Sequence, residues 1–385
     1  MIDPRALRPS YSRFLREGRI LLTGHSHQAW PDVAHDGLLE SFDDAAEHVD
    51  DKWAKAAEAA DAVRRAVARI IGAHEDEIAL GQNTHELVAR FLSALDLAKR
   101  PHLVASAGEF HSMHRQLARL SEAGVEVALV PVAPLDDLAA RLARAVRDDT
   151  AALLVSSVLF ESSSIVPDLP TAIAAAQRRG AEVLIDAYHA FSVVPFTVRE
   201  LGPDPIFVTG GGYKYAQWGE GNCWLRVPRD TKLRPVYTGW FSDFASLSAP
   251  REGALRVSYG PRPADRFAGS TYDPASHYRA RAVIRFFEER GLDVASLRAL
   301  SLRQTERILA GLEGYRIRTP RAPERRGGFV AVEIEGADRV VAALRARGIF
   351  TDARGSILRL GPAPYVTDDE IDAALAALRE IAPPR

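Results

Sequence analysis

The chain has 385 residues and a formal net charge of −2, with 49 lysines and arginines against 51 aspartates and glutamates. A near-neutral chain offers no strongly basic face, so we expect no nucleic-acid partner. A hydrophobic content of 47% and a charged content of 26% are ordinary for a globular protein. The single cysteine, Cys223, excludes an intrachain disulfide and a cysteine-based metal cluster, and we predict no metal site.

The first 24 residues lack the apolar core of a signal peptide, and the chain contains no run of 18 apolar residues. We therefore expect a cytoplasmic protein that does not associate with a membrane.

Helical and strand patterns alternate along most of the chain. Helical spacing of apolar residues covers 44–71, and Gly72 is expected to end that helix. Further helical patterns cover 135–147 and 171–179. Short apolar runs predict strands at 102–106, 125–130, 151–156, 182–185, 206–209 and 223–227. Strands that alternate with helices predict a mostly parallel sheet with helices on both faces, which binds ligands at the carboxyl ends of its strands.

The last third of the chain has a different pattern. Two long helices are predicted at 278–289 and 294–312, followed by a stretch rich in proline and arginine at 318–326. The remaining elements form a compact α+β unit: a strand at 328–335, a helix at 337–347, strands near Ile349 and Ile357, and a helix at 368–381. We expect a large domain over 44–275 and a small domain made of 1–43 and 276–385.

The five lysines stand out because nearly every other basic residue is arginine. Lys52, Lys55, Lys99 and Lys232 fall on a charged helix, at a helix end or in a polar turn. Lys214 instead follows a predicted strand in the segment FVTGGGYKYAQWGEGN, with a tyrosine on each side. A lysine held by apolar and aromatic neighbours has a lowered pKa and can act as a nucleophilic amine. The alternative is an exposed lysine in a flexible glycine-rich turn.

Asp186 directly follows the apolar run 183–185 in the segment LIDAYHAF, so its carboxylate is expected at the carboxyl end of a buried strand. A carboxylate is costly to bury there unless it pairs with a cation. Pyridoxal phosphate offers a protonated pyridine nitrogen, and its electron-sink chemistry needs that proton. The alternative is a helix N-cap or the partner of an arginine. The order strand, aspartate, strand, glycines and aromatic-flanked lysine favours the cofactor.

These two segments, Asp186-Ala-Tyr-His189 and Tyr213-Lys214-Tyr215, resemble the class V branch of the fold-type I pyridoxal phosphate enzymes. The resemblance covers the chain from about Gly24 to Tyr365. Within that branch the sequence is most similar to the kynureninases, at residues 212–215, 239–240, 266–271 and 358–365. The resemblance implies an α/β fold, with a mainly parallel seven-stranded sheet flanked by helices and a small α+β domain.

The resemblance also assigns residues. Lys214 matches the lysine that holds the cofactor as a Schiff base and then carries the α-proton, and Asp186 matches the partner of the pyridine nitrogen, with His189 beside it. The other matched cofactor contacts are Asn83, Thr84, His85, Tyr213, Trp240 and Thr271 at the phosphate, Phe110 on the ring face and Ser157 near the phenolic oxygen. In the family the contact at Thr271 comes from the partner subunit, which implies a homodimer with the active site at the interface.

Arg359, in the segment LRLG, falls where this fold type binds the α-carboxylate of its substrate, and a planar guanidinium suits a carboxylate. An exposed charge is the alternative. The resemblance thus implies an amino-acid substrate, with kynureninase-like addition of water and cleavage of the Cβ–Cγ bond to release alanine. Transamination to a keto acid is the alternative reaction, and a non-catalytic member that binds an amino acid is the third reading.

The sequence departs from the kynureninases in two segments. His111-Ser112-Met113-His114 replaces the usual proline, hydroxyl and aspartate, and the stretch 24–30 differs as well. His25, Trp30 and His114 are therefore candidate substrate contacts, and His25, His27 and His114 are candidate acid–base groups, with a structural histidine as the alternative for each. A cysteine desulfurase is disfavoured, because Cys223 lies in an apolar run where a small hydrophobic residue is expected.

Overall fold

A seven-stranded sheet organises the larger part of the computed structural model, which describes residues 2–202, 204–248 and 256–384. The strand order is β2-β8-β7-β6-β5-β3-β4, in which the five strands from β7 to β4 are parallel and β8 runs antiparallel to both of its neighbours. The strands are β2 (Ile78–Gly81), β3 (His102–Ser106), β4 (Glu126–Val130), β5 (Thr150–Ser156), β6 (Glu182–Asp186), β7 (Phe207–Gly211) and β8 (Cys223–Arg226). The predicted mainly parallel sheet is therefore confirmed.

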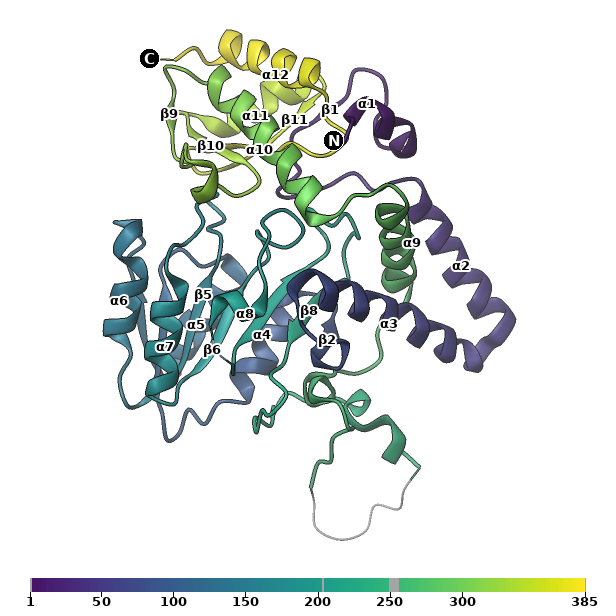
Figure 1. The fold of residues 1–385 in the computed structure, drawn as a ribbon, viewed down its shortest axis with the longest axis vertical. Coiled ribbons are helices and arrows are strands. Elements are labelled where there is room, and N and C mark those ends of the chain that lie inside the picture. Colours follow the sequence, from purple (N-terminus) through teal and green to yellow (C-terminus); the bar gives the residue numbers. More distant parts are fainter. Residues whose placement is uncertain (1, 203, 249–255, 385) are drawn as a thin grey trace.

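Helices cover both faces of this sheet, as Figure 1 shows. Alternate side chains of each strand point to opposite faces, so Leu184 of β6 packs with one helical layer, while Val183 and Ile185 pack with the other. The helices against the large sheet are α3 (Lys52–Ile71), α4 (Thr84–Ser93), α5 (His111–Glu122), α6 (Leu138–Ala145), α7 (Leu169–Arg178) and α8 (Val198–Leu201). Strands buried on both faces explain the continuous apolar runs in the sequence.

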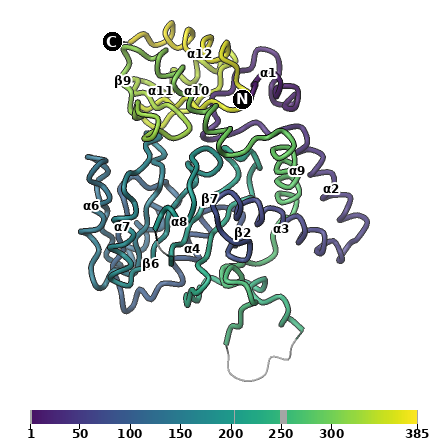
Figure 2. The backbone as a smooth tube through the Cα atoms, viewed as in Figure 1, coloured from purple at the N-terminus to yellow at the C-terminus, as the bar shows by residue number. Residues whose placement is uncertain are grey.

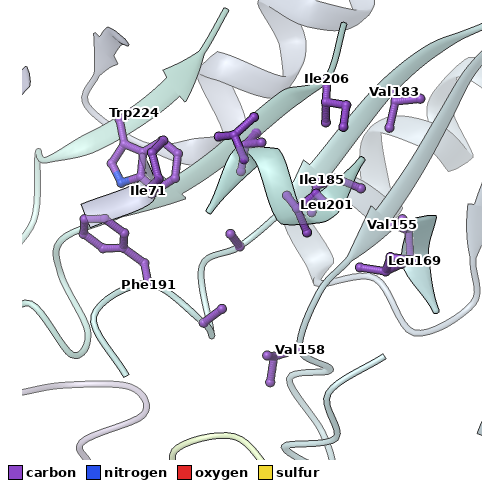
Figure 3. Packing of buried hydrophobic residues seen from close by; sticks show 14 of the residues in the cluster. Ile71, Val155, Val158, Leu169, Val183, Ile185, Phe191, Leu201, Ile206 and Trp224 are labelled. Atoms are coloured by element: carbon purple, nitrogen blue, oxygen red, sulfur yellow. The ribbon is translucent and has the colours of Figure 1, made fainter. Parts of the chain in front are cut away.

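The larger core lies between the sheet and the layer that contains α3, α6, α7 and α8. Figure 3 shows part of this core, in which Val183 and Ile185 of β6 lie near Ile206, Leu201 and Leu169. Trp224 and Phe191 close one end of it, with their ring centroids 5.0 Å apart. Such close packing makes the strand ends rigid, which fixes the positions of the residues that follow them.

A second unit packs on the large one and is drawn mainly in yellow and light green at the top of Figures 1 and 2. Its four-stranded sheet has the order β12-β13-β10-β9, and β1 pairs with β11. Its strands are β1 (Ile20–Leu21), β9 (Arg316–Ile317), β10 (Val330–Glu333), β11 (Ile349–Phe350), β12 (Asp352–Arg354) and β13 (Ile357–Leu360). Its helices are α1 (Pro4–Leu7), α10 (Val294–Gly311), α11 (Ala337–Ala346) and α12 (Asp368–Ile381). The predicted α+β unit is present, and the proposed domain boundaries stay a prediction.

Two helical predictions differ from the structure in detail. The helix predicted over 44–71 is two helices, α2 (Val33–His48) and α3, because Val49 has a φ of 49° and turns the chain between them. Gly72 ends α3 in the left-handed conformation with a φ of 66°, as predicted. The helix predicted from residue 278 is α9 (Ala275–Glu289), which packs beside α2 and α3. Among the described residues, no helix is both long and apolar enough to cross a bilayer.

Candidate active site

A cavity of about 380 Å³ opens at the carboxyl ends of the parallel strands. Nine of the predicted site residues line it: His27, Asn83, Thr84, His85, Phe110, Asp186, His189, Tyr213 and Lys214. They come from five separate segments of the chain, and the parallel strands bring these segments to one edge of the sheet. The fold therefore assembles the two halves of the predicted cofactor site, the aspartate after β6 and the lysine after β7.

Lys214 lies in a tight turn after β7 that has no room for side chains at its glycines. A Cβ atom on Gly212 would lie 2.1 Å from the Trp218 ring, and one on Gly211 would lie 2.5 Å from the Tyr188 hydroxyl. These contacts explain the glycine run in the sequence as a close-packed turn rather than a flexible one. The turn holds Lys214 Nζ 4.6 Å from the centroid of the Tyr188 ring, inside the cavity wall.

Burial dominates the chemistry of the lysine. It lowers the pKa of Lys214 to about 7; Asp186 opposes this effect, and Arg359 adds to it. Lys214 Nζ lies 2.6 Å from His189 Nε2. Burial and the nearby Lys214 likewise lower the pKa of His189, so the imidazole is neutral and can accept from the amine. The arrangement supplies a nucleophilic amine near neutral pH.

Asp186 ends β6 with its carboxylate in the cavity and 8% of the residue exposed. Its Oδ1 accepts a hydrogen bond of 2.8 Å from the backbone N–H of Tyr188. Burial raises the pKa of Asp186, whereas the Tyr188 N–H and Lys214 oppose that rise. A cationic ring nitrogen would stabilise this buried carboxylate, as the sequence argument requires.

The start of α4 faces the cavity with Asn83, Thr84 and His85. Asn83 caps the helix, because its Oδ1 accepts a hydrogen bond of 2.9 Å from the backbone N–H of Glu86. The positive end of the helix dipole and its free N–H groups favour an anion at this place. This anion site lines the same cavity as Asp186 and Lys214. The arrangement suits a ligand that has a phosphate at one end and a ring in the middle.

Aromatic side chains form another wall. Phe110 and Phe160 meet edge to face with centroids 5.2 Å apart, and Met113 and Val158 extend the apolar surface. Phe110 lies with its centroid 5.5 Å from Lys214 Nζ, which agrees with its predicted place on the face of the cofactor ring. Phe160 is not among the residues predicted from the sequence, although a strand followed by VLF is a pattern that marks it.

Arg359 does not line the cavity in this structure. Its guanidinium binds the Asp352 carboxylate through Nε and Nη2, and Nη1 donates to the Phe160 carbonyl over 2.9 Å. His25 Nε2 lies 2.8 Å from the same carboxylate. Burial alone would raise the pKa of Asp352, but its contacts with His25 and Arg359 lower that pKa overall. Burial lowers the pKa of His25 to about 4. We call His25, Asp352 and Arg359 the paired cluster.

Other predicted contacts also lie away from the cavity. Trp30 stacks under the Arg279 guanidinium at 4.4 Å, and His114 is exposed on α5. Ser157 donates to the backbone carbonyl of Asp186 over 3.3 Å, and its neighbour Ser156 lines the cavity in its place. The contact of Ser157 with the phenolic oxygen of the cofactor stays a prediction. Of the residues in segments 24–30 and 111–114, those on the cavity are His27, Ser112 and Met113.

Trp240 and Thr271 lie in the segment between β8 and α9, and neither reaches the cavity of its own chain. Trp240 is 41% exposed, and it stacks on Phe244, which is 55% exposed. The described parts of this segment that flank residues 249–255 lie at the lower edge of the large unit in Figure 1. Cys223 is 4% exposed at the cavity wall, and burial raises the pKa of its thiol, which suits a packing role better than that of a nucleophile.

The fold and the site together define a class of protein. The sequence profile described as Aminotransferase class-V matches residues 36–363, so the chain belongs to that family. Its cofactor is pyridoxal 5′-phosphate, and the protein is a class V enzyme that depends on it. The residues present fit that group: α4 offers an anion site, Asp186 a buried carboxylate and Lys214 an amine of lowered pKa, while His189 Nδ1 is a buried atom without a partner among the described residues.

Known proteins resemble the chain over nearly its whole length. A kynureninase from Bacillus cereus is 27% identical and covers 96% of this chain and 89% of its own length. A Bacillus subtilis protein described as an uncharacterized aminotransferase is 23% identical, with 88% of each chain covered. Among solved structures, the cystine C–S lyase C-DES with cysteine persulfide is 18% identical with a TM-score of 0.81, covering 96% of this chain and 98% of its own. A cysteine desulfurase from Thermococcus onnurineus NA1 is 19% identical with a TM-score of 0.81, covering 99% and 98%. These two structures share the fold.

Proposed function

We propose that the protein cleaves the Cβ–Cγ bond of kynurenine or a related amino acid by hydrolysis and releases alanine. The observation that carries this proposal is the aromatic wall of Phe110 and Phe160, which lines the same cavity as the Lys214–His189 pair. Phe110 would stack on the cofactor ring, and an aromatic side chain of a substrate would pack against Phe160. The likeness to kynureninases over 96% of the chain supports the same reaction.

The residues of the chain would divide the work in three ways. When bound, the cofactor withdraws electrons from the α-carbon of the substrate. Asp186 keeps the ring nitrogen protonated, and the start of α4 holds the phosphate. Lys214, whose amine is available near neutral pH because it is buried, moves the proton at the α-carbon, and His189 orients the amine through the contact of 2.6 Å.

Arg359 is the proposed partner of the substrate α-carboxylate, although it does not line the cavity in this structure and its Nη1 donates to the Phe160 carbonyl. Two of its three nitrogens bind Asp352, which leaves further N–H groups on Nη1 and Nη2. We infer that a substrate carboxylate would use those donors while Asp352 keeps the plane of the guanidinium fixed. His27 is exposed and lines the cavity, with its ring centroid 5.3 Å from that of Tyr213. It is the proposed acid–base group for the leaving group of the substrate.

The test is a product assay. The holoenzyme is incubated with kynurenine or 3-hydroxykynurenine in the absence of any keto acid, and alanine and the matching anthranilate are measured. The proposal predicts equal amounts of both products, and none with the Lys214→Ala variant. Turnover that depends strictly on a keto acid would contradict it.

Transamination is the second candidate, because an aminotransferase-like relative matches 88% of the chain and the same grip on the cofactor serves that reaction. It predicts no alanine without an acceptor and a new amino acid when an acceptor is added. The same incubation, with and without a keto acid, therefore separates the two reactions.

We further propose a homodimer with the cavity at its interface. Trp240 and Thr271 are matched to cofactor contacts, yet they lie outside the cavity of their own chain, which is expected if they complete the site of a second copy. The segment that carries them exposes Val236, Tyr237, Phe244 and Leu247. Such an apolar patch fits burial between subunits. Light scattering of an active sample would show a dimer, and an active monomer would refute the proposal.

A further inference from the structure

A second buried carboxylate, Glu109, lies beside the cofactor site. It belongs to the turn that joins the end of β3 to α5, and 4% of the residue is exposed. Its Oε1 accepts from the Ser106 hydroxyl and, over 3.0 Å, from the backbone N–H of Ser156. Its Oε2 accepts from the Ser156 hydroxyl over 2.6 Å. The side chain therefore ties the turn after β3 to the end of β5.

These hydrogen bonds fix the positions of two predicted cofactor contacts, Phe110 and Asp186. Phe110 is the next residue in the chain and lines the cavity. The hydrogen bonds of Glu109 therefore hold the backbone that carries the Phe110 ring. Ser156 pairs in register with Asp186 across β5 and β6, and both residues line the cavity. The turn itself is tightly packed, because a Cβ atom on Gly108 would lie 2.7 Å from the Val132 side chain.

The charge of Glu109 interacts with Asp186. Burial raises the pKa of Glu109 to about 7; the hydrogen bonds from Ser106 and Ser156 oppose the rise, and the nearby Asp186 adds to it. The two side chains that contact Glu109 are uncharged serines, Ser106 on β3 and Ser156 on β5. The charged groups nearby are Asp186 on β6 and Lys214 in the turn after β7, and Lys214 opposes the rise in the pKa of Asp186. Glu109 is thus a carboxylate whose ionisation adds negative charge beside Asp186.

We propose that Glu109 is a positioning residue for the cofactor ring, which orients Phe110 and the strand end at Asp186 and, when ionised, reinforces the proton on the ring nitrogen. A positive ring nitrogen stabilises two neighbouring carboxylates that would otherwise repel each other. Ionised Glu109 therefore tightens the binding of the protonated cofactor. This role rests on the cofactor alone and holds for cleavage and for transamination.

The sign of the pH effect separates this role from a purely structural one. At pH 6 Glu109 is mostly protonated, so Glu109→Gln, which keeps the shape and removes the charge, changes the affinity for cofactor little. At pH 8 Glu109 is ionised in the wild type, and the variant lacks that charge. We expect the dissociation constant of the variant, relative to the wild type, to rise about tenfold from pH 6 to pH 8, which corresponds to one pKa unit of interaction.

The experiment measures the dissociation constant of pyridoxal phosphate by equilibrium dialysis of the holoenzyme at both pH values. The matched control is Glu182→Gln, a partly buried carboxylate at the opposite end of β6, where the ratio should stay near one. A ratio for Glu109→Gln that is the same at pH 6 and pH 8, or a control that shows the same rise, overturns the proposal.

Ser156→Ala gives a second test that does not depend on the folding of Glu109→Gln. It keeps the carboxylate and removes a hydrogen bond that favours its ionised form. The pH at which the cofactor affinity rises above that of Glu109→Gln should therefore be higher for this variant than for the wild type. An unchanged midpoint overturns the proposal, and activity is not needed for either measurement.

Discussion

The molecule contains two buried clusters of charge that differ in how they are paired. In the paired cluster, the Arg359 guanidinium and the Asp352 carboxylate balance each other's charge, and His25 also contacts the carboxylate. In the cavity, Lys214 contacts the neutral His189, and Asp186 accepts from a backbone N–H. The first arrangement holds a geometry, whereas the second keeps its groups available for a ligand. Variants in the two clusters should therefore fail in different ways.

The largest effect is expected for Lys214→Ala. Loss of the amine should lower turnover by at least about 1000-fold, roughly 4 kcal/mol of barrier, and abolish the absorbance band at about 410–430 nm. Stability should change little, because the amine contacts the neutral His189 rather than a carboxylate. The exposed Lys232→Ala is the control and should keep both the band and the activity. A Lys214→Ala protein with normal activity would contradict the division between the clusters.

Asp186→Asn should have the next largest effect, because the amide cannot balance a positive ring nitrogen. We expect kcat to fall by about 100-fold, or roughly 2.7 kcal/mol of barrier, in a protein that still folds. Steady-state kinetics with saturating cofactor measure this effect. The surface change Asp96→Asn is the control, and equal losses in the two variants would show that Asp186 has no special role.

In the paired cluster, Asp352→Asn should reduce stability rather than cofactor binding. It leaves the Arg359 charge buried without a counterion, and we expect the free energy of unfolding to fall by about 2–3 kcal/mol. Denaturant unfolding measures the change, and the cofactor band should persist. Asp372→Asn breaks an exposed pair with Arg307 and should cost less than about 0.5 kcal/mol. A stable Asp352→Asn protein without the band would reverse the roles of the two clusters.

A smaller effect is expected from the titration of His25. The pKa of His25 is about 4 in the folded protein, below the ordinary value of 6.5, so the unfolded chain binds the proton first. The contribution of this residue to stability is complete above pH 6.5 and is lost as the pH falls toward 4. When the pH is lowered from 6.5 to 5, the free energy of unfolding should fall by about 1–2 kcal/mol less in His25→Asn than in the wild type. Parallel curves for the two proteins would show that His25 is not the titrating group.

The sequence predicts the large sheet well, because strands buried on both faces appear as continuous apolar runs. The run at 102–106 coincides with β3. Strand β2 was missed, since its four residues carry little periodic signal and its antiparallel pairing with β8 brings together positions far apart in the sequence. The break at Val49 was missed because no glycine or proline marks it.

The candidate site was predictable only where one segment carries the signal. Lys214 and Asp186 were found because each follows an apolar strand in a distinctive segment. The pairing of Arg359 with Asp352 depends on the register of β12 and β13, and the contact of His25 with Asp352 joins residues 327 positions apart. Glu109 was overlooked because its partners come from two different strands. Such contacts arise from tertiary structure and leave no local pattern.

The most direct test of the central claim is to locate the cofactor on the chain. Borohydride reduction of the holoenzyme fixes pyridoxal phosphate to the lysine that holds it, and peptide mapping then identifies that lysine among the five. The account predicts one label per chain, on Lys214, and none in Lys214→Ala. A label on Lys52, Lys55, Lys99 or Lys232, or an unlabelled wild-type protein, would contradict it.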